Sequence, residues 1–369
     1  MPARAVFAVL IASVAAVPSN VMPVLAGLLA AFHQLDERQI GFFVSCGTVA
    51  GLTVSATAPY WIARANVRVL ITACLCVYAV GLVALGFAST AAIYPIQFVL
   101  GGTAVVVASC CISLLARLHN PARAMSIKTA SDIVLASGLL YFLPIQMLGF
   151  RGMTLALAAV FVLALALTPK LPAHIAEGGR TNVASRSLKE APADAWLALA
   201  TMAAFNIGGI AVWVFLGKLA LHAGLDVRAS ANVIAAGLFV GVFGSLGAAA
   251  LAGRSERIWP QVTSGIVFLF SVPALTAASG VVQFAAVVFV FNVAWNFFMP
   301  FVMGLLATRD DTGRLAALMP GTGMLGGILG PPLAGSLMAG VSYPAAMWAM
   351  TAIASVAVAS YSWLSRTRA

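Results

Sequence analysis

One acidic side chain lies inside an apolar stretch of the sequence, and its position gives it the clearest chemistry in the chain. Of ten Asp and Glu residues, only Asp132 falls within the interior of a predicted helix. It follows Arg123 by nine positions, which places it roughly 13 Å along that helix. Desolvation drives a carboxylate toward its neutral form, and proton coupling requires a carboxyl group that gains and loses a proton. Asp132 is therefore a candidate for proton coupling or solute contact.

A basic residue accompanies this carboxylate. Lys128 precedes Asp132 by one helical turn on the same face, and this spacing allows an ion pair. Such a pair would keep Asp132 charged near the cytoplasmic end of the helix. The spacing leaves three roles open: a local structural pair, a proton-coupling site formed by Asp132 and Lys128, and a part in gating.

Side-chain amides form a second group of polar residues within apolar runs. Asn292 and Asn296 are four residues apart, so they share a helix face, and Trp295 is adjacent. Asn20 lies between Pro18 and Pro23, and Asn206 lies in another run. Polar groups at such depth are costly and are therefore candidates for a solute-binding path, and amides both donate and accept hydrogen bonds. The alternative is that each amide ties neighbouring helices together. Lys218 and His222, near the end of a run, are expected to extend to the membrane surface.

The sequence lacks the motifs of enzymes, nucleotide-driven pumps, metal sites and nucleic-acid-binding proteins. The sequence has no Gly-x-Ser-x-Gly, His-Glu-x-x-His or phosphate-binding loop, so we expect neither an enzyme nor an ATP-driven pump. The cysteines lie in apolar runs without metal-ligand spacing, and we expect no metal and no cofactor. The net charge of +10 comes from single residues between apolar runs, which argues against nucleic acid as a partner.

Membrane-spanning helices must position these polar groups. The chain has 369 residues, of which 62% are hydrophobic and 8% charged, with a mean hydropathy of +1.04. A soluble domain is roughly a quarter charged, so a soluble protein is excluded and a polytopic, all-α membrane protein is predicted. The twelve apolar runs are 5–31, 40–62, 69–88, 92–115, 129–148, 152–168, 195–217, 231–252, 261–279, 281–306, 315–338 and 342–364.

The twelve runs fall into two sets of six. Residues 169–194 hold three prolines and seven charges, and are predicted to be a cytoplasmic linker between an N-terminal half, 1–168, and a C-terminal half, 195–369. Most loop Lys and Arg residues fall on the side of the termini, and only Arg38, Arg151 and Arg228 fall on the other side. The positive-inside rule therefore places both termini in the cytoplasm. The first run stays apolar to Ala31, so we read it as an uncleaved span.

The two halves are related by an internal repeat. A shift of 190 residues places Leu35, Asp36 and Arg38 on Leu225, Asp226 and Arg228. The same shift matches a second set of residues: Gly47, Gly51, Ser55 and Arg64 with Gly237, Gly241, Ser245 and Arg254. The paired glycines predict close helix contacts, either sliding or static. Six spans per half give both copies the same orientation, an arrangement known in transporters with the substrate site between the halves.

This architecture resembles that of the major facilitator superfamily. The family typically has a Gly-x-x-x-Asp-Arg-x-Gly-Arg-Arg loop between spans two and three. Arg64 and Arg68 occupy matching basic positions, Asn66 can serve the turn, the Asp is absent, and Arg254 follows Gly253 in the repeat copy. The resemblance implies that Arg64, Arg68 and Arg254 lie in cytoplasmic gating loops.

The resemblance also bears on the cavity and the direction of transport. In the family, spans one, four, seven and ten line the central cavity, which would make Asn20, Asn206, Asn292, Trp295 and Asn296 substrate-binding. Proton-coupled drug exporters of the family carry an Arg in span four and a Gly-Pro signature in span five. In this chain the Arg is missing from the matching stretch, which begins at Gln97, and the Gly-Pro signature is missing from span five. A similar Gly- and Pro-rich string stands instead in span eleven, at 326–335, where a hinge or a fixed kink is expected.

We therefore expect a monomeric secondary active transporter of the inner membrane. It would move a small solute through the lipid bilayer by alternating access, with protons as a coupling ion. Because the candidate cavity groups are amides and aromatic rings, efflux of an apolar or weakly polar compound is favoured. The alternatives are a proton-coupled uptake permease and a membrane sensor on the same fold that transports nothing.

Overall fold

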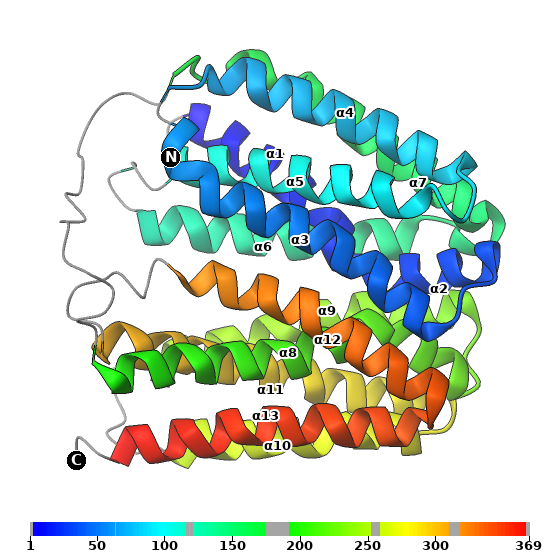
Figure 1. Ribbon diagram of the computed structural model, residues 1–369, viewed down its shortest axis with the longest axis vertical. Coiled ribbons are helices and arrows are strands. Elements are labelled where there is room, and N and C mark those ends of the chain that lie inside the picture. The colour runs from blue at the N-terminus through cyan, green and yellow to red at the C-terminus, as the bar shows by residue number, and fades with distance from the viewer. Residues whose placement is uncertain are drawn as a thin grey trace. The chain divides into compact units, whose positions relative to one another are not determined.

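The chain folds into helices throughout the part that the structure describes. This computed structural model describes residues 3–62, 64–115, 118, 121–174, 192–251, 259–309 and 318–366 (Figure 1). Arg254 and most of the predicted linker 169–194 lie outside the described residues. The helices are α1 Ala3–Asn20, α2 Met22–His33, α3 Glu37–Trp61, α4 Val67–Phe87, α5 Ile93–Leu115, α6 Pro121–Phe142, α7 Ile145–Leu165, the 3-10 helix η1 Thr168–Lys170, α8 Ala193–His222, α9 Val227–Leu251, α10 Trp259–Ala277, α11 Gly280–Arg309, α12 Met319–Gly340 and α13 Tyr343–Arg366.

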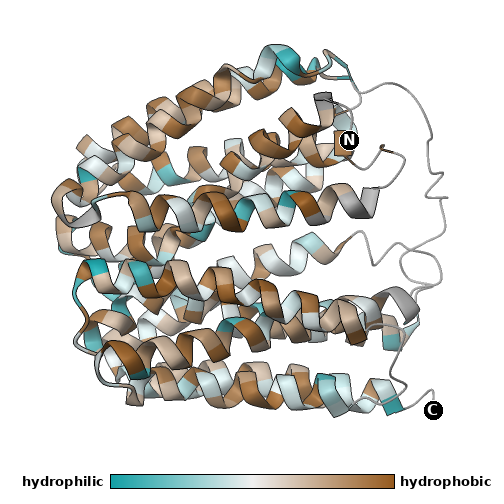
Figure 2. Cartoon of the chain, turned by 180° about the vertical axis from the view of Figure 1, so that it is seen from behind, coloured by the Kyte–Doolittle hydropathy of each residue, from teal (hydrophilic) through white to brown (hydrophobic). Residues whose placement is uncertain are grey.

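Most of these helices have the length and composition of membrane spans. Within the described residues nine helices qualify, and α1 with α2 forms a further, bent candidate. Apolar residues cover the helices along nearly their whole length (Figure 2). The helices α6, which carries Lys128 and Asp132, and α12, which is rich in glycine and proline, fall outside this set. The protein is thus an all-α, multi-pass membrane protein.

Two of the predicted runs are divided differently in the structure. The first run, 5–31, is two helices that meet at an angle of 49° after Asn20. Pro18 lacks an N–H group, so the helical hydrogen-bond ladder is interrupted at this bend. The fifth run is predicted at 129–148, but α6 extends from Pro121 to Phe142, and the helix ends before Pro144. Proline disfavours helical geometry in the residue before it, which accounts for the second break.

The described chain divides into two compact units, and the helices of each unit pack in the same order. The N-terminal unit contains residues Met1–Gln34 and Phe43–Gly179, and the C-terminal unit contains Leu35–Phe42 and Arg180–Ala369. In the N-terminal unit α1 packs on α5, α6 and α7, and α4 packs on α5 and α7. In the C-terminal unit α8 packs on α11, α12 and α13, and α10 packs on α11 and α13 (Figure 1). The packing pattern therefore follows the internal repeat.

The strongest part of the sequence repeat is a helix start. Gln34 and Gly224 both adopt the left-handed conformation, with φ of 56° and 87°. A buried leucine follows each of them, and then comes an aspartate whose carboxylate accepts a hydrogen bond from a backbone N–H three residues later. Asp36 accepts from Gln39 and Asp226 from Ala229, each at 2.7 Å. The repeated Asp is thus the N-cap of α3 and of α9.

Candidate functional site

The Lys128–Asp132 pair lies on α6 in the N-terminal unit. Lys128 Nζ lies 2.6 Å from Asp132 Oδ2, and the carboxylate is buried, with the residue 8% exposed. The Ser13 hydroxyl of α1 donates to the Lys128 carbonyl at 3.4 Å. Within the described residues, the second oxygen, Asp132 Oδ1, is buried without a hydrogen-bond partner. The ion pair expected from the spacing is therefore formed, and one carboxylate oxygen is left to accept a proton or a donor group.

In the C-terminal unit, Asn206 joins two helices. Its amide Nδ2 on α8 donates to Thr322 Oγ1 on α12 at 3.0 Å, and both residues are buried. The Thr322 hydroxyl in turn donates to the Met319 carbonyl at 2.7 Å. A Cβ at Gly326, one turn further along α12, would lie 2.8 Å from the Asn206 carbonyl carbon, so the two helices approach each other closely. This contact has the geometry of the helix tie, one of the two roles left open for Asn206.

The amides of α11 face the glycines of α9. The Nδ2 atoms of Asn292 and Asn296 donate to carbonyls of their own helix, each at 2.9 Å. A Cβ at Gly237 would lie 3.1 Å from Asn292 Nδ2, and a Cβ at Gly241 would lie 2.8 Å from Asn296 Nδ2. The glycines thus leave room for the amides between α9 and α11.

Trp295, on the same helix, contacts α8 instead. Its ring fills the space above Gly209, where a Cβ would come within 2.7 Å of Trp295 Cε3. It contacts three further rings edge-on, those of Phe205, Phe268 and Phe291, at centroid distances of 5.6 to 5.8 Å. Trp295 is therefore part of an aromatic cluster between α8, α10 and α11.

A matching contact in the N-terminal unit involves an amide that sequence analysis did not select. A Cβ at Gly47 would lie 2.8 Å from Gln97 Nε2, and Gly101 faces the Gly47 backbone. The glycine faces therefore join the second and fourth helices of each repeat, with an amide from the fourth helix alongside. Asn20, half-buried at the bend after α1, belongs to this same unit.

The expected gating arginines occupy different environments. Arg68 donates from Nε and Nη2 to the Leu171 carbonyl, at 2.9 and 2.6 Å, so it binds the end of the last helix of its own unit. Asn66, expected only to serve the turn, caps α4 by accepting a hydrogen bond from Val69 N at 3.2 Å. Arg64 is exposed. Arg309, 7% exposed, plays a similar part in the C-terminal unit, donating to Asp194 Oδ2 at 3.0 Å and to the Leu364 carbonyl.

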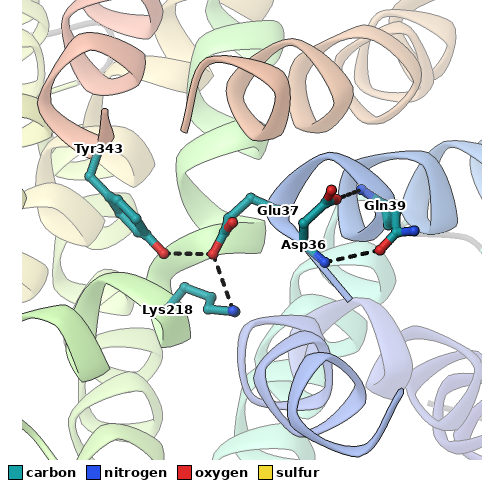
Figure 3. A network of polar contacts seen from close by, with 5 residues as sticks. All are labelled: Asp36, Glu37, Gln39, Lys218 and Tyr343. Atoms are coloured by element: carbon teal, nitrogen blue, oxygen red, sulfur yellow. Dashed lines mark hydrogen bonds and ion pairs between the residues drawn. The ribbon is translucent and has the colours of Figure 1, made fainter. Parts of the chain in front are cut away.

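Sequence analysis also missed a charged cluster in the C-terminal unit, drawn in Figure 3. Lys218 does not extend freely to the surface, because its Nζ lies 3.2 Å from Glu37 Oε1. The Tyr343 hydroxyl donates to the same oxygen at 2.7 Å. Glu37 is the first residue of α3, and its partners are the end of α8 and the start of α13. One signal in the sequence could have found Glu37, because the two repeats differ at this position: the second repeat has the apolar Val227 where the first has Glu37.

The chain is similar in structure to solved transporters. A bacterial homolog of the human lysosomal transporter Spinster, inward-facing and unoccupied, matches with a TM-score of 0.76 and 14% identity over 98% of this chain and 96% of that chain. The nucleoside transporter NupG matches with a TM-score of 0.75 and 13% identity over 99% of each chain. No family's sequence profile matches the chain, and no curated protein matches it in sequence. The chain therefore shares its overall fold with these two transporters.

Proposed function

We propose that this protein is a secondary active transporter that moves a small solute across the inner membrane by alternating access. The fold that it shares with two transporters supports this proposal. The proposed organisation is twelve spans in two halves, 1–168 and 195–369, with a cytoplasmic linker at 169–194, both termini in the cytoplasm and one chain per transporter. Efflux of an apolar or weakly polar solute is favoured over uptake, because the candidate cavity groups Asn20, Asn206, Asn292, Trp295 and Asn296 are amides and an aromatic ring rather than fixed charges.

We propose Asp132 as the group that takes up and releases the driving proton, with Lys128 as its counter-ion. The observation that carries this role is the buried carboxylate with one oxygen bound to Lys128 and the other without a partner among the described residues. Protonation of the carboxyl would weaken the ion pair and leave the ammonium free to move. A pair of this kind converts a change of protonation into a change of side-chain contacts.

A thermal-shift screen of the purified full-length protein would first identify a ligand. Nucleosides belong in the first panel, since one structural neighbour is a nucleoside transporter. Transport of the stabilising compound is then measured in liposomes with an imposed pH gradient. A ligand that binds tightly and never crosses the membrane would favour the sensor and contradict the transporter.

The role of Asp132 is tested in the same liposomes. Asp132→Asn is expected to insert and fold, to lose transport driven by the pH gradient, and to keep solute exchange between the two sides. Asp226→Asn is the matched control, because it removes one exposed carboxylate and asparagine still caps a helix. Gradient-driven transport by Asp132→Asn at the rate of the control would remove Asp132 from the coupling mechanism.

A further inference from the structure

The end of α2 is held by a small group of rings in the N-terminal unit. The His33 ring lies edge-on to the rings of Phe32 and Phe150, with centroid distances of 5.0 and 5.6 Å. Phe150 belongs to α7, the main helix neighbour of α2 (Figure 1). Directly before it, Gly149 has φ of 57° and ψ of −163°, a conformation essentially restricted to glycine, and this breaks the helical geometry of α7. The contact between His33 and Phe150 therefore joins the last residue of α2 to α7 just beyond this break.

The two ring nitrogens of His33 are in different environments. Nδ1 lies 3.3 Å from Thr90 Oγ1, in the turn between α4 and α5. Among the described residues, Nε2 is buried and has no hydrogen-bond partner. A neutral ring can keep Nε2 free of hydrogen, whereas a protonated ring carries an N–H group at both nitrogens. Protonation would therefore bury a charged donor without an acceptor, which is costly for the packed ring.

The charges around His33 also disfavour its protonated form. The guanidinium carbon of Arg151 lies 5.0 Å from the centre of the Phe32 ring, and His33 contacts the same ring. Within the described part of the N-terminal unit, the one acidic side chain is that of Asp132, which is already paired with Lys128. The ring group thus contains one fixed cation and offers no counter-ion to a second.

The acidic residues that follow α2 in the sequence have other partners. Asp36 caps α3, and Glu37 is bound to Lys218. The internal repeat places Ala223 at the position equivalent to His33, so the repeated fold does not require an imidazole there. The bend of 49° after α1 separates α2 from the rest of the first run, so α2 can shift without α1. His33 is therefore a titratable group at the end of a short helix that has few other neighbours.

We propose that His33 is a pH-responsive contact, in which protonation of the ring releases the end of α2 from α7. The charged ring packs less well than the neutral one. The contact is therefore present above about pH 6.5, the ordinary titration range of histidine, and weakens as the pH falls below it. The proposed topology places this end of α2 on the outer side, so the contact would respond to acidification there. It lies within one unit and involves no solute, so it does not depend on the proposed function.

The contact can be tested by double electron–electron resonance on the full-length protein. Spin labels are attached through Ala31→Cys on α2 and Ala73→Cys on α4, two exposed positions, after replacement of the five native cysteines. Because α4 packs on α7, the distance between the labels reports the position of α2 relative to α7. From about pH 7.5 to about pH 5, the ratio of displaced to packed α2 should rise roughly fivefold, the ratio that about 1 kcal/mol gives for a buried donor without an acceptor.

Three variants complete the design. His33→Phe keeps an aromatic ring that cannot be charged, so it should give the packed distance at both pH values, and His33→Gln serves if that variant does not fold. His33→Arg is charged throughout and should show the displaced population already at neutral pH. His222→Phe is the matched control, because it replaces a histidine that stacks on another aromatic ring, that of Tyr343, and it should keep the full pH response.

Two results would overturn the proposal. One is a distance distribution that does not change with pH, and the other is a pH response that persists in His33→Phe or His33→Gln. Because no solute enters the measurement, either result would leave the transport function itself unaffected.

Discussion

The contact between α8 and α12 allows a stability prediction that depends on one methyl group. In Gly326→Ala the new Cβ would lie 2.8 Å from both the carbonyl carbon and the oxygen of Asn206. Ordinary contact begins at 3.4 Å, so the helices must separate by 0.6 Å, the difference between these two distances. The obstructing atoms belong to a helix backbone and cannot rotate away. The substitution should therefore displace α12 from α8.

The displacement has two costs. Overpacking of this kind costs about 2 kcal/mol. It would also lengthen the bond from Asn206 Nδ2 to Thr322 Oγ1 from 3.0 Å to beyond 3.5 Å, where it no longer counts as a hydrogen bond. An interhelical hydrogen bond in a membrane contributes about 1 kcal/mol. The free energy of unfolding should therefore fall by about 3 kcal/mol relative to a matched alanine substitution.

The matched substitution is Gly323→Ala, one turn earlier on the same helix. Among the described residues, no atom of another helix lies within 4 Å of a Cβ at Gly323, so this variant gains the same helix propensity without the clash. Both proteins are unfolded with a denaturing detergent from mild micelles, and the transition is followed by circular dichroism. If Gly326→Ala unfolds at the same detergent fraction as Gly323→Ala, then α8 and α12 do not approach as closely as described, and the helix tie at Asn206 loses its support.

Two further predictions concern the ends of the helices. Arg309→Gln should lower the free energy of unfolding by about 2 kcal/mol, because it removes the partner of Asp194 and a donor to the end of α13, and a chemical-denaturation curve would measure it. Asp194→Asn, which keeps a neutral acceptor, should cost less; an equal loss in both variants would contradict a role for Arg309 at α13. Severing the chain within 175–191 should give two fragments that associate and transport when co-expressed, as measured by co-purification and liposome assays. Fragments that insert and associate without transporting would count against a flexible linker.

Local physical rules made part of this protein readable from its sequence. Apolar composition and run lengths predicted a membrane protein and located most of the helices, because the bilayer imposes the length of a span on the chain. The bend after Asn20 and the start of α6 at Pro121 were not predicted. The Lys128–Asp132 pair followed from a spacing of one helical turn, and the structure forms it at 2.6 Å. The repeated Asp36 and Asp226 stood out by their register, although their capping role is visible only in the backbone geometry.

Tertiary structure decided the contacts between residues that are distant in sequence. Glu37 and Lys218 are 181 residues apart, and Asn206 and Thr322 are 116 apart. No periodicity links such residues, because their distance is set by which helices pack and at what height. The apolar runs left Glu37 outside the interior of any predicted helix, and Lys218 was expected to extend to the surface, whereas the structure brings the two side chains to 3.2 Å. Hydropathy determines how many helices a membrane protein can have, and the fit of side chains between those helices determines which polar groups meet.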